Sequence, residues 1–133
     1  MMTVLVTDAG FGPDDWTAGF AEAATRETDA GLDLASDVDP VNVEFDGVPA
    51  IRVDFPSFAD GRGFTIARQL RLRGFTGRLR ARGHVLADQY AMARRAGFDE
   101  VEIDDVLAAR QPEDQWIFRA DWQAHNYQAR LRG

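Results

Sequence analysis

The sequence contains no cysteine and no lysine, and it has only two histidines, His84 and His125. Without cysteine the chain forms no disulfide, performs no thiol chemistry and offers no thiolate to an iron–sulfur cluster. Without lysine it forms no Schiff base, and all fifteen of its cationic side chains are arginines. Two histidines also make a histidine-rich zinc site improbable.

Long apolar runs are also absent: none reaches the ~18 residues of a membrane-spanning helix. Residues 1–8 have neither the basic region nor the apolar stretch of a secretory signal. We therefore expect a cytoplasmic protein that does not bind a membrane. Its length of 133 residues and hydrophobic content of 45% are typical of one globular domain. We predict a single domain, 1–133, with an N-terminal part (1–47), a central unit (48–105) and a C-terminal tail (106–133).

The charge is divided into three blocks. Residues 1–61 carry 13 acids and 2 arginines, residues 62–97 carry 9 arginines and one acid, and residues 98–133 carry 8 acids and 4 arginines. The net charge of −7 argues against a nucleic-acid partner, because phosphate neutralisation dominates such binding. The basic block either holds a small anion or an acidic partner, or its arginines pair with the acidic flanks; we favour pairing.

The second half of the chain has a strand–helix pattern, in which glycines end the helices. We predict strands at Ile51–Phe55, Arg78–Arg82 and Phe98–Ile103, and helices at Phe64–Arg73 and Val85–Ala96. This βαβαβ order predicts an α/β fold with a parallel sheet.

Each of these strands alternates apolar and charged residues. One sheet face should therefore pack on both helices while the other carries the charges, as in part of a (βα) barrel. Such an open charged face allows a homodimer that would cover it.

The N-terminal part and the tail have weaker patterns. We expect a strand at Thr3–Thr7, a helix from Asp14 or Asp15 to about Thr25, and a strand at Val41–Phe45. Residues 26–40 look like a connection, and the structure of 26–50 is left open. The tail is rich in aromatic residues, which either cover an open sheet edge or the end of the domain, or form a partner surface. They are Trp116, Phe118, Trp122 and Tyr127.

The turn between the first predicted strand and helix of the central unit is the best candidate for anion binding. Asp60, Gly61, Arg62 and Gly63 stand where free backbone N–H groups and the helix dipole favour anions. Two glycines allow a ligand to approach the backbone, and Arg62 can grip an oxyanion. In the alternative interpretation, Asp60 caps the helix and Arg62 pairs with a carboxylate.

Three more candidates follow the ends of the next two strands. Arg82 is a further anion-binding candidate, and His84 and Asp104 are the candidate catalytic residues. Because the carboxyl ends of parallel strands collect functional groups, Arg62, Arg82, His84 and Asp104 are expected on one rim. The acidic run from Asp99 to Asp105 either binds a hard cation or, as we favour, pairs with arginines.

A nicotinamide cofactor has weak support. Gly61-x-Gly63 resembles the start of a dinucleotide fingerprint, and Arg82 lies where a 2′-phosphate would be met. The third small residue, however, is Ala67, one place late, because Ile66 holds the fingerprint position. The sequence therefore requires no cofactor, with NADP as a minor alternative.

Three segments together resemble bacterial domain-of-unknown-function family 934. They are Asp54–Arg68, Gly77–Gln89 and Arg95–Asp99, and the resemblance covers roughly residues 50–105. It implies a probable oxidoreductase or an accessory protein of assimilatory sulfite reduction, with sulfite reductase or its electron donor as partner, and no established catalytic residue. The second hypothesis is a small oxyanion- or phosphate-binding enzyme, and one form of it would be an NADP-dependent oxidoreductase.

Overall fold

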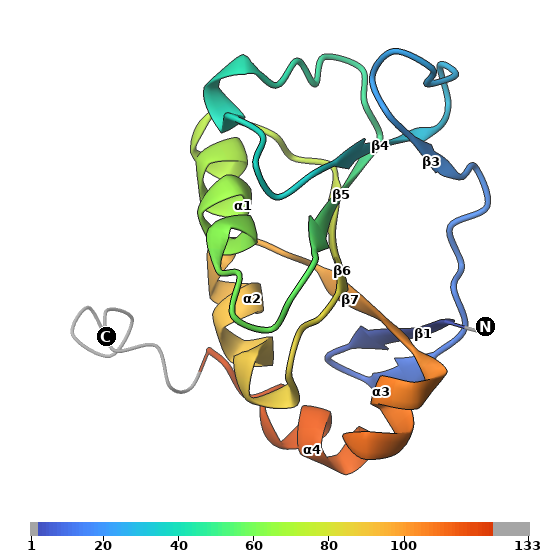
Figure 1. The fold of residues 1–133 in the computed structure, drawn as a ribbon, viewed down its shortest axis with the longest axis vertical. Coiled ribbons are helices and arrows are strands. Elements are labelled where there is room, and N and C mark those ends of the chain that lie inside the picture. Colours follow the sequence, from blue (N-terminus) through green and yellow to red (C-terminus); the bar gives the residue numbers. More distant parts are fainter. Residues whose placement is uncertain (1–2, 124–133) are drawn as a thin grey trace.

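The computed structural model describes residues 3–123, which form an α/β fold with a seven-stranded mixed sheet (Figure 1). The strands are β1 (Thr3–Thr7), β2 (Gly10–Gly12), β3 (Phe20–Ala21), β4 (Gly31–Leu34), β5 (Ala50–Phe55), β6 (Arg78–Gly83) and β7 (Glu100–Asp104). The helices are α1 (Arg62–Leu72), α2 (Tyr90–Ala96), α3 (Asp105–Arg110) and α4 (Glu113–Phe118), with 3₁₀ turns η1 (Pro40–Asn42) and η2 (Ala87–Gln89). No helix in this described part is long and apolar enough to cross a membrane.

The strand order is β2-β1-β7-β6-β5-β4-β3. Strands β3 to β7 run parallel to one another. Strand β1 pairs antiparallel with β7, and β2 pairs antiparallel with β1 at that edge of the sheet. The predicted βαβαβ unit is confirmed as β5-α1-β6-α2-β7, with consecutive strands as neighbours. The parallel sheet of the prediction is extended on both sides, because the N-terminal part supplies four further strands.

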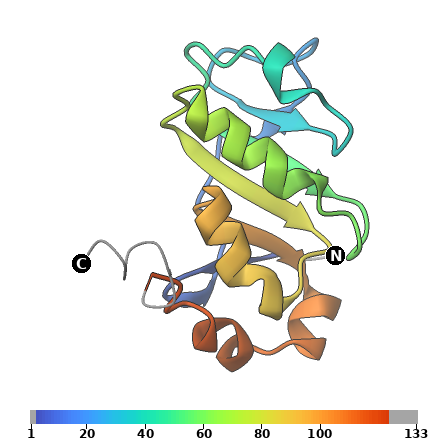
Figure 2. The ribbon, with the colours of Figure 1, turned by 90° about the vertical axis from the view of Figure 1, so that its left-hand side faces the viewer.

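Helices α1 and α2 cover one face of the sheet, and Figure 2 shows both in front of the central strands. The apolar positions of the alternating strands point to this face; Ile51, Val53, Leu79 and Val101 are fully buried there. Gly97 ends α2 in a left-handed conformation (φ +119°), which a side chain would strain. The predicted one-sided helix packing is therefore confirmed.

The opposite face carries the charged positions, but it is not left open as predicted. The segment between β2 and β3 passes along this face, on the side away from α1 and α2 (Figure 1). The predicted helix from Asp14 or Asp15 to Thr25 is wrong: these residues are irregular apart from the short strand β3 and a turn at 23–25. Their acidic side chains bind arginines of the sheet instead of capping a helix.

Two other predictions are corrected. The strand predicted at Val41–Phe45 is absent, because Asp39 accepts a hydrogen bond from Val41 N–H and Pro40 starts the turn η1. The connection at 26–40 contains β4, which adds to the sheet beside β5.

The tail forms α3 and α4, and its aromatic residues mostly pack inward. Trp116 is buried against Tyr90, and its indole N–H donates to the carbonyl of Gln111 at 2.8 Å. Trp122 donates to Asp8, while Phe118 is exposed. Tyr127 and His125 lie outside the described residues. The tail thus covers the end of the domain, as one of the two interpretations expects.

Candidate functional site

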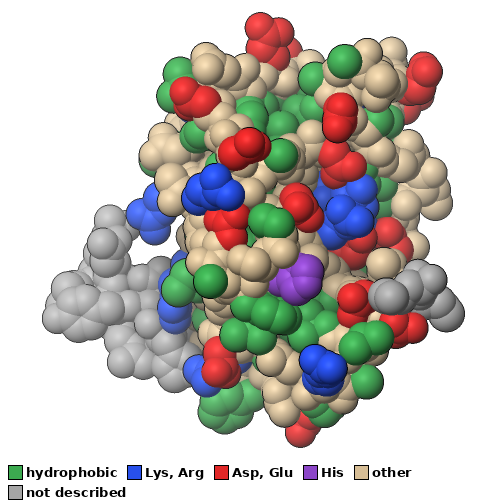
Figure 3. Space-filling view, viewed as in Figure 1, with side chains coloured by type: hydrophobic (Ala, Val, Ile, Leu, Met, Phe, Trp, Pro, Cys, Tyr) green, Lys and Arg blue, Asp and Glu red, His purple; other side chains and the backbone are tan. Residues whose placement is uncertain are grey.

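The charged sheet face is a lattice of ion pairs between neighbouring strands, here called the ion-pair lattice. It contains four arginines and four acids: Asp33, Arg52, Asp54, Arg78, Arg80, Arg82, Glu100 and Glu102. Its positive and negative charges balance within the sheet itself. The favoured interpretation of the basic block, pairing with acidic flanks, is the arrangement that the structure shows. Acidic and basic side chains are also interspersed on the face of the molecule that is turned to the viewer in Figure 1, as Figure 3 shows.

Arg80 is the centre of the lattice and is 0% exposed. Its Nε donates to Glu100 at 2.5 Å, and its Nη1 donates to Glu102 at 2.8 Å. Burial opposes the guanidinium charge, but the surrounding carboxylates outweigh that cost and raise the pKa of Arg80. A buried cation with this many acceptors is fixed in position and permanently charged.

Residues 13–20, here called the strap, cover part of this lattice. Asp14 accepts two hydrogen bonds of 2.9 Å from the guanidinium of Arg80, and Asp15 pairs with Arg78. Phe20 lies under the guanidinium of Arg80, 5.2 Å from its ring centroid. The strap thus occupies part of the face that a second copy was predicted to cover.

The open end of the lattice is a groove at the carboxyl ends of β5, β6 and β7. Arg82, His84 and Asp104 meet in its polar part, a hollow of about 430 Å³ that Asp54 and Glu102 also line. The rim predicted from the strand ends therefore brings three of its four residues together. An adjoining hollow of about 160 Å³ shares His84 and Asp104 and is otherwise mostly apolar; its other side chains include Phe58, Val106, Leu107 and Arg110. Both hollows together are called the carboxyl-end groove.

The three rim residues are held in different ways. His84 places Nδ1 3.1 Å from the carbonyl oxygen of Phe55, so Nδ1 carries a proton and donates there. Asp104 caps α3 by accepting from Leu107 N–H at 2.7 Å. Arg82 is half-exposed, and its ion pairs with described residues are long, 3.5 Å to Glu102 and 3.7 Å to Asp54. Of the three, Arg82 keeps the most hydrogen-bonding capacity for a ligand.

The fourth predicted rim residue, Arg62, lies elsewhere. Its guanidinium donates to both oxygens of Asp60, at 3.0 and 2.8 Å, and to Ser36 at 3.0 Å. Asp60 also accepts from Arg62 N–H, and these bonds hold the pKa of the Asp60 carboxyl well below its ordinary value. The start of α1 is thus occupied by the chain's own carboxylate. The pairing of Arg62 agrees with the alternative interpretation of this turn, although the N-cap residue is Gly61 and not Asp60.

The two glycines of that turn serve different purposes. Gly63 is buried against the ring of Phe55, where a Cβ atom would clash, so it allows α1 to approach β5 closely. Gly61 is exposed, and a Cβ atom there would make only an ordinary van der Waals contact, with the ring of Phe64 at 3.9 Å. With Asp60 at the helix N-terminus, this loop is a poor place for a cofactor phosphate, and its anion-binding role stays a prediction.

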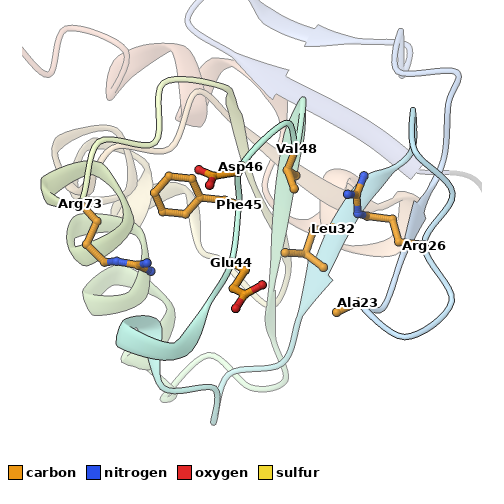
Figure 4. A pocket seen from close by; sticks show the side chains of 8 residues that line it. All are labelled: Ala23, Arg26, Leu32, Glu44, Phe45, Asp46, Val48 and Arg73. Atoms are coloured by element: carbon orange, nitrogen blue, oxygen red, sulfur yellow. The ribbon is translucent and has the colours of Figure 1, made fainter.

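A further hollow, of about 540 Å³, was not indicated by the sequence (Figure 4). It lies between Arg26 and Arg73, which approach from opposite sides, with Glu44 and Phe45 also in its lining. The guanidinium of Arg26 is bound to backbone carbonyls, and that of Arg73 donates to the carbonyls of Pro40 and Val43. Most of its residues come from irregular loops, which leave no periodic signal; Leu32 belongs to β4 and Arg73 caps the end of α1. Both arginines therefore hold loop backbone in place through these hydrogen bonds.

Metal-binding clusters are absent from residues 3–123. The acidic run at 99–105 is divided by its alternation, as favoured from the sequence: Glu100 and Glu102 face arginines of the lattice. Asp99 pairs with Arg71 at 3.0 Å.

The fold and the site define an α/β protein with an internally neutralised sheet face and a mixed apolar and charged groove at its carboxyl edge. Residues 31–133 match the family described as bacterial protein of unknown function (DUF934), and the chain belongs to that family. The match is longer than the 50–105 segment on which the resemblance was based. The searches of curated proteins and of solved structures gave no match.

Proposed function

We propose that this chain is an accessory protein of assimilatory sulfite reduction that binds a protein partner at its carboxyl-end groove. The partner is sulfite reductase or its electron donor. The metabolic role is taken from what the sequence resemblance implies, since the matching family is described as one of unknown function. The groove supports the binding role.

The observation that carries the proposal is the exposed apolar part of the groove. Phe58 is 41% exposed and Val106 is 49% exposed, and both line the hollow beside His84. Protein interfaces combine such an apolar centre with a polar rim, here supplied by Arg82 and Asp104. The groove also lies outside the carboxyl ends of parallel strands, where α/β proteins bind their ligands.

Affinity co-purification tests the proposal in the native host, grown on sulfate or on a reduced sulfur source. The tagged wild-type chain is compared with Phe58→Ala/Val106→Ala and with Leu72→Ala. Leu72 is 74% exposed on α1, away from the groove residues, and is the matched apolar control. Mass spectrometry is expected to identify a sulfite reductase subunit or its electron donor with the wild type and with Leu72→Ala, but not with the groove variant.

Recovery of the chain alone under sulfate growth would contradict the proposal. Recovery of the same partner with the groove variant would place the contact elsewhere. Recovery only of untagged copies of this chain would assign the groove to a homodimer.

A second candidate, a small oxyanion- or phosphate-binding enzyme, has one supporting observation, the loosely paired guanidinium of Arg82. Thermal unfolding with sulfite, phosphate or NADP tests it. An increase in Tm that Arg82→Ala abolishes, and that Arg62→Ala leaves in place, supports this candidate. No increase with any of these ligands contradicts it.

A further inference from the structure

We propose that the ion-pair lattice around Arg52, Arg78 and Arg80 is a docking surface for an acidic, aromatic segment of a partner protein. The strap then acts as an internal stand-in that the partner segment displaces. This inference concerns a different part of the sheet face from the carboxyl-end groove. It does not depend on a role in sulfite reduction.

The first argument is charge. The lattice is neutral without the strap, because each of its arginines already has a carboxylate on a neighbouring strand. Asp14 and Asp15 therefore add two carboxylates to a surface that does not need them for neutrality. They bind because Arg78 and Arg80 still have donors directed at this side of the sheet.

The second argument is the chemistry of the contact. Phe20 lies under two guanidinium groups, 4.4 Å from Arg52 and 5.2 Å from Arg80, and Trp16 lies 6.0 Å from Arg78. Bidentate carboxylate pairing combined with aromatic stacking is the way arginines recognise acidic, aromatic peptides. The strap sequence, Asp-Asp-Trp-Thr-Ala-Gly-Phe, thereby gives the pattern of the partner segment.

The third argument is the attachment of the strap. Among the described residues, the main chain of 13–18 makes no hydrogen bond outside the strap, and Thr17 and Ala18 are exposed. Gly12 precedes the segment, and Gly19 near its end has a φ of +76°. Side chains therefore hold residues 13–18 in place. The end of the strap is also held by its backbone, because the carbonyl of Gly19 accepts from Gly31 N–H at 2.8 Å and Phe20 pairs with Gly31 in the sheet, so displacement of the whole strap must break these bonds too.

The fourth argument is position. The whole lattice lies within residues 31–133, the part that matches the family, whereas the strap lies outside that match. Arg82 and Glu102 belong to the lattice and also line the open groove. A partner segment that enters the groove can therefore continue along the sheet face into the place of the strap.

A peptide with the sequence of residues 13–22 provides the probe, and the full chain is the receptor. The strap is weakened by Asp14→Asn/Asp15→Asn. Glu27→Gln/Asp29→Asn makes the same change of charge at exposed side chains outside the strap and is the matched control. Binding is followed by nuclear magnetic resonance through the arginine Nε–H signals, up to several millimolar peptide.

The strap variant is expected to bind the peptide at least tenfold more tightly than the wild type or the control, because a closed strap reduces the apparent affinity. The peptide with both aspartates replaced by asparagine is expected not to bind. Equal affinity for all three chains, or no binding to a strap variant that keeps its folded spectrum, would overturn the proposal. A wild-type dimer lost in the strap variant would also overturn it, since the face would then serve a second copy.

Discussion

The carboxylate of Asp14 lies against the guanidinium of Arg80 in a two-pronged pair, with both hydrogen bonds 2.9 Å long, although 66 positions separate the two residues. This pair joins the N-terminal strap to the centre of the sheet. It explains why an acidic stretch that resembles a helix start adopts an irregular conformation, since long-range pairing replaces local capping.

Replacing Arg80 with methionine is expected to lower the free energy of unfolding by about 3–5 kcal/mol, because Glu100 and Glu102 lose a buried counter-charge. Urea unfolding followed by circular dichroism measures the loss. Arg68→Met is the control, since Arg68 is exposed on α1 and makes no ion pair with a described residue. A loss below about 1 kcal/mol for the Arg80 variant would show that the lattice contributes little.

Asp14→Asn is expected to cost about 0.5–1 kcal/mol at pH 7, a modest value because Asp14 is partly exposed. Hydrogen bonds from Arg80 lower the pKa of Asp14 below its ordinary 3.8, so its stabilising effect is complete above that pH. The effect is lost as the pH falls through the lowered pKa. Urea unfolding at pH 7, 5 and 3 should show an equal difference between the chains at the first two values and a smaller one at pH 3. A difference that grows toward pH 3 would contradict this assignment.

Trp116→Ala is expected to cost about 3–5 kcal/mol, since the indole is buried against Tyr90 and makes one hydrogen bond. Phe118→Ala, two positions later, is expected to change stability by less than about 0.5 kcal/mol because Phe118 is 76% exposed. Thermal unfolding of both variants compares the stability lost on removal of a buried and of an exposed aromatic side chain of α4. Similar losses in the two variants would contradict the inward packing of the tail.

Gly63→Ala is expected to destabilise the fold by about 1–3 kcal/mol, because the new Cβ would clash with the ring of Phe55. Gly61→Ala should have little effect, since the nearest atom to its Cβ would be 3.9 Å away. Chemical denaturation of the two variants separates a packing role of Gly63 from a role in ligand contact. An unchanged stability in Gly63→Ala would favour ligand contact.

The central part of the fold was predictable because its signals are local. Alternation in β5, β6 and β7 and glycines at the helix ends identified the βαβαβ unit, and β1 was predicted with its observed bounds. The strap was not predictable, since arginines more than sixty positions later determine its conformation. β4 alternates over Leu32, Asp33 and Leu34 but has only four residues, too few to mark a strand, so its pairing with β5 decides its structure.

The candidate site, like the fold, was predictable only in part. Arg82, His84 and Asp104 were expected on one rim because strand ends of a parallel sheet share an edge, and the structure brings them together. Arg62 was expected there too, but the carboxylate of Asp60, two positions before it, binds its guanidinium. The apolar half of the groove was missed, since Phe58 and Val106 come from separate segments that only the fold brings together.

Sedimentation velocity with the purified chain and purified sulfite reductase of the same bacterium is the most direct test of the proposed function. A complex is predicted with the wild type and with Leu72→Ala, and its loss is predicted with Phe58→Ala/Val106→Ala. If the electron donor is the partner, it forms the same complex with the same dependence on the groove. Separate sedimentation of the wild-type chain from both proteins, at tens of micromolar and low salt, would contradict the account.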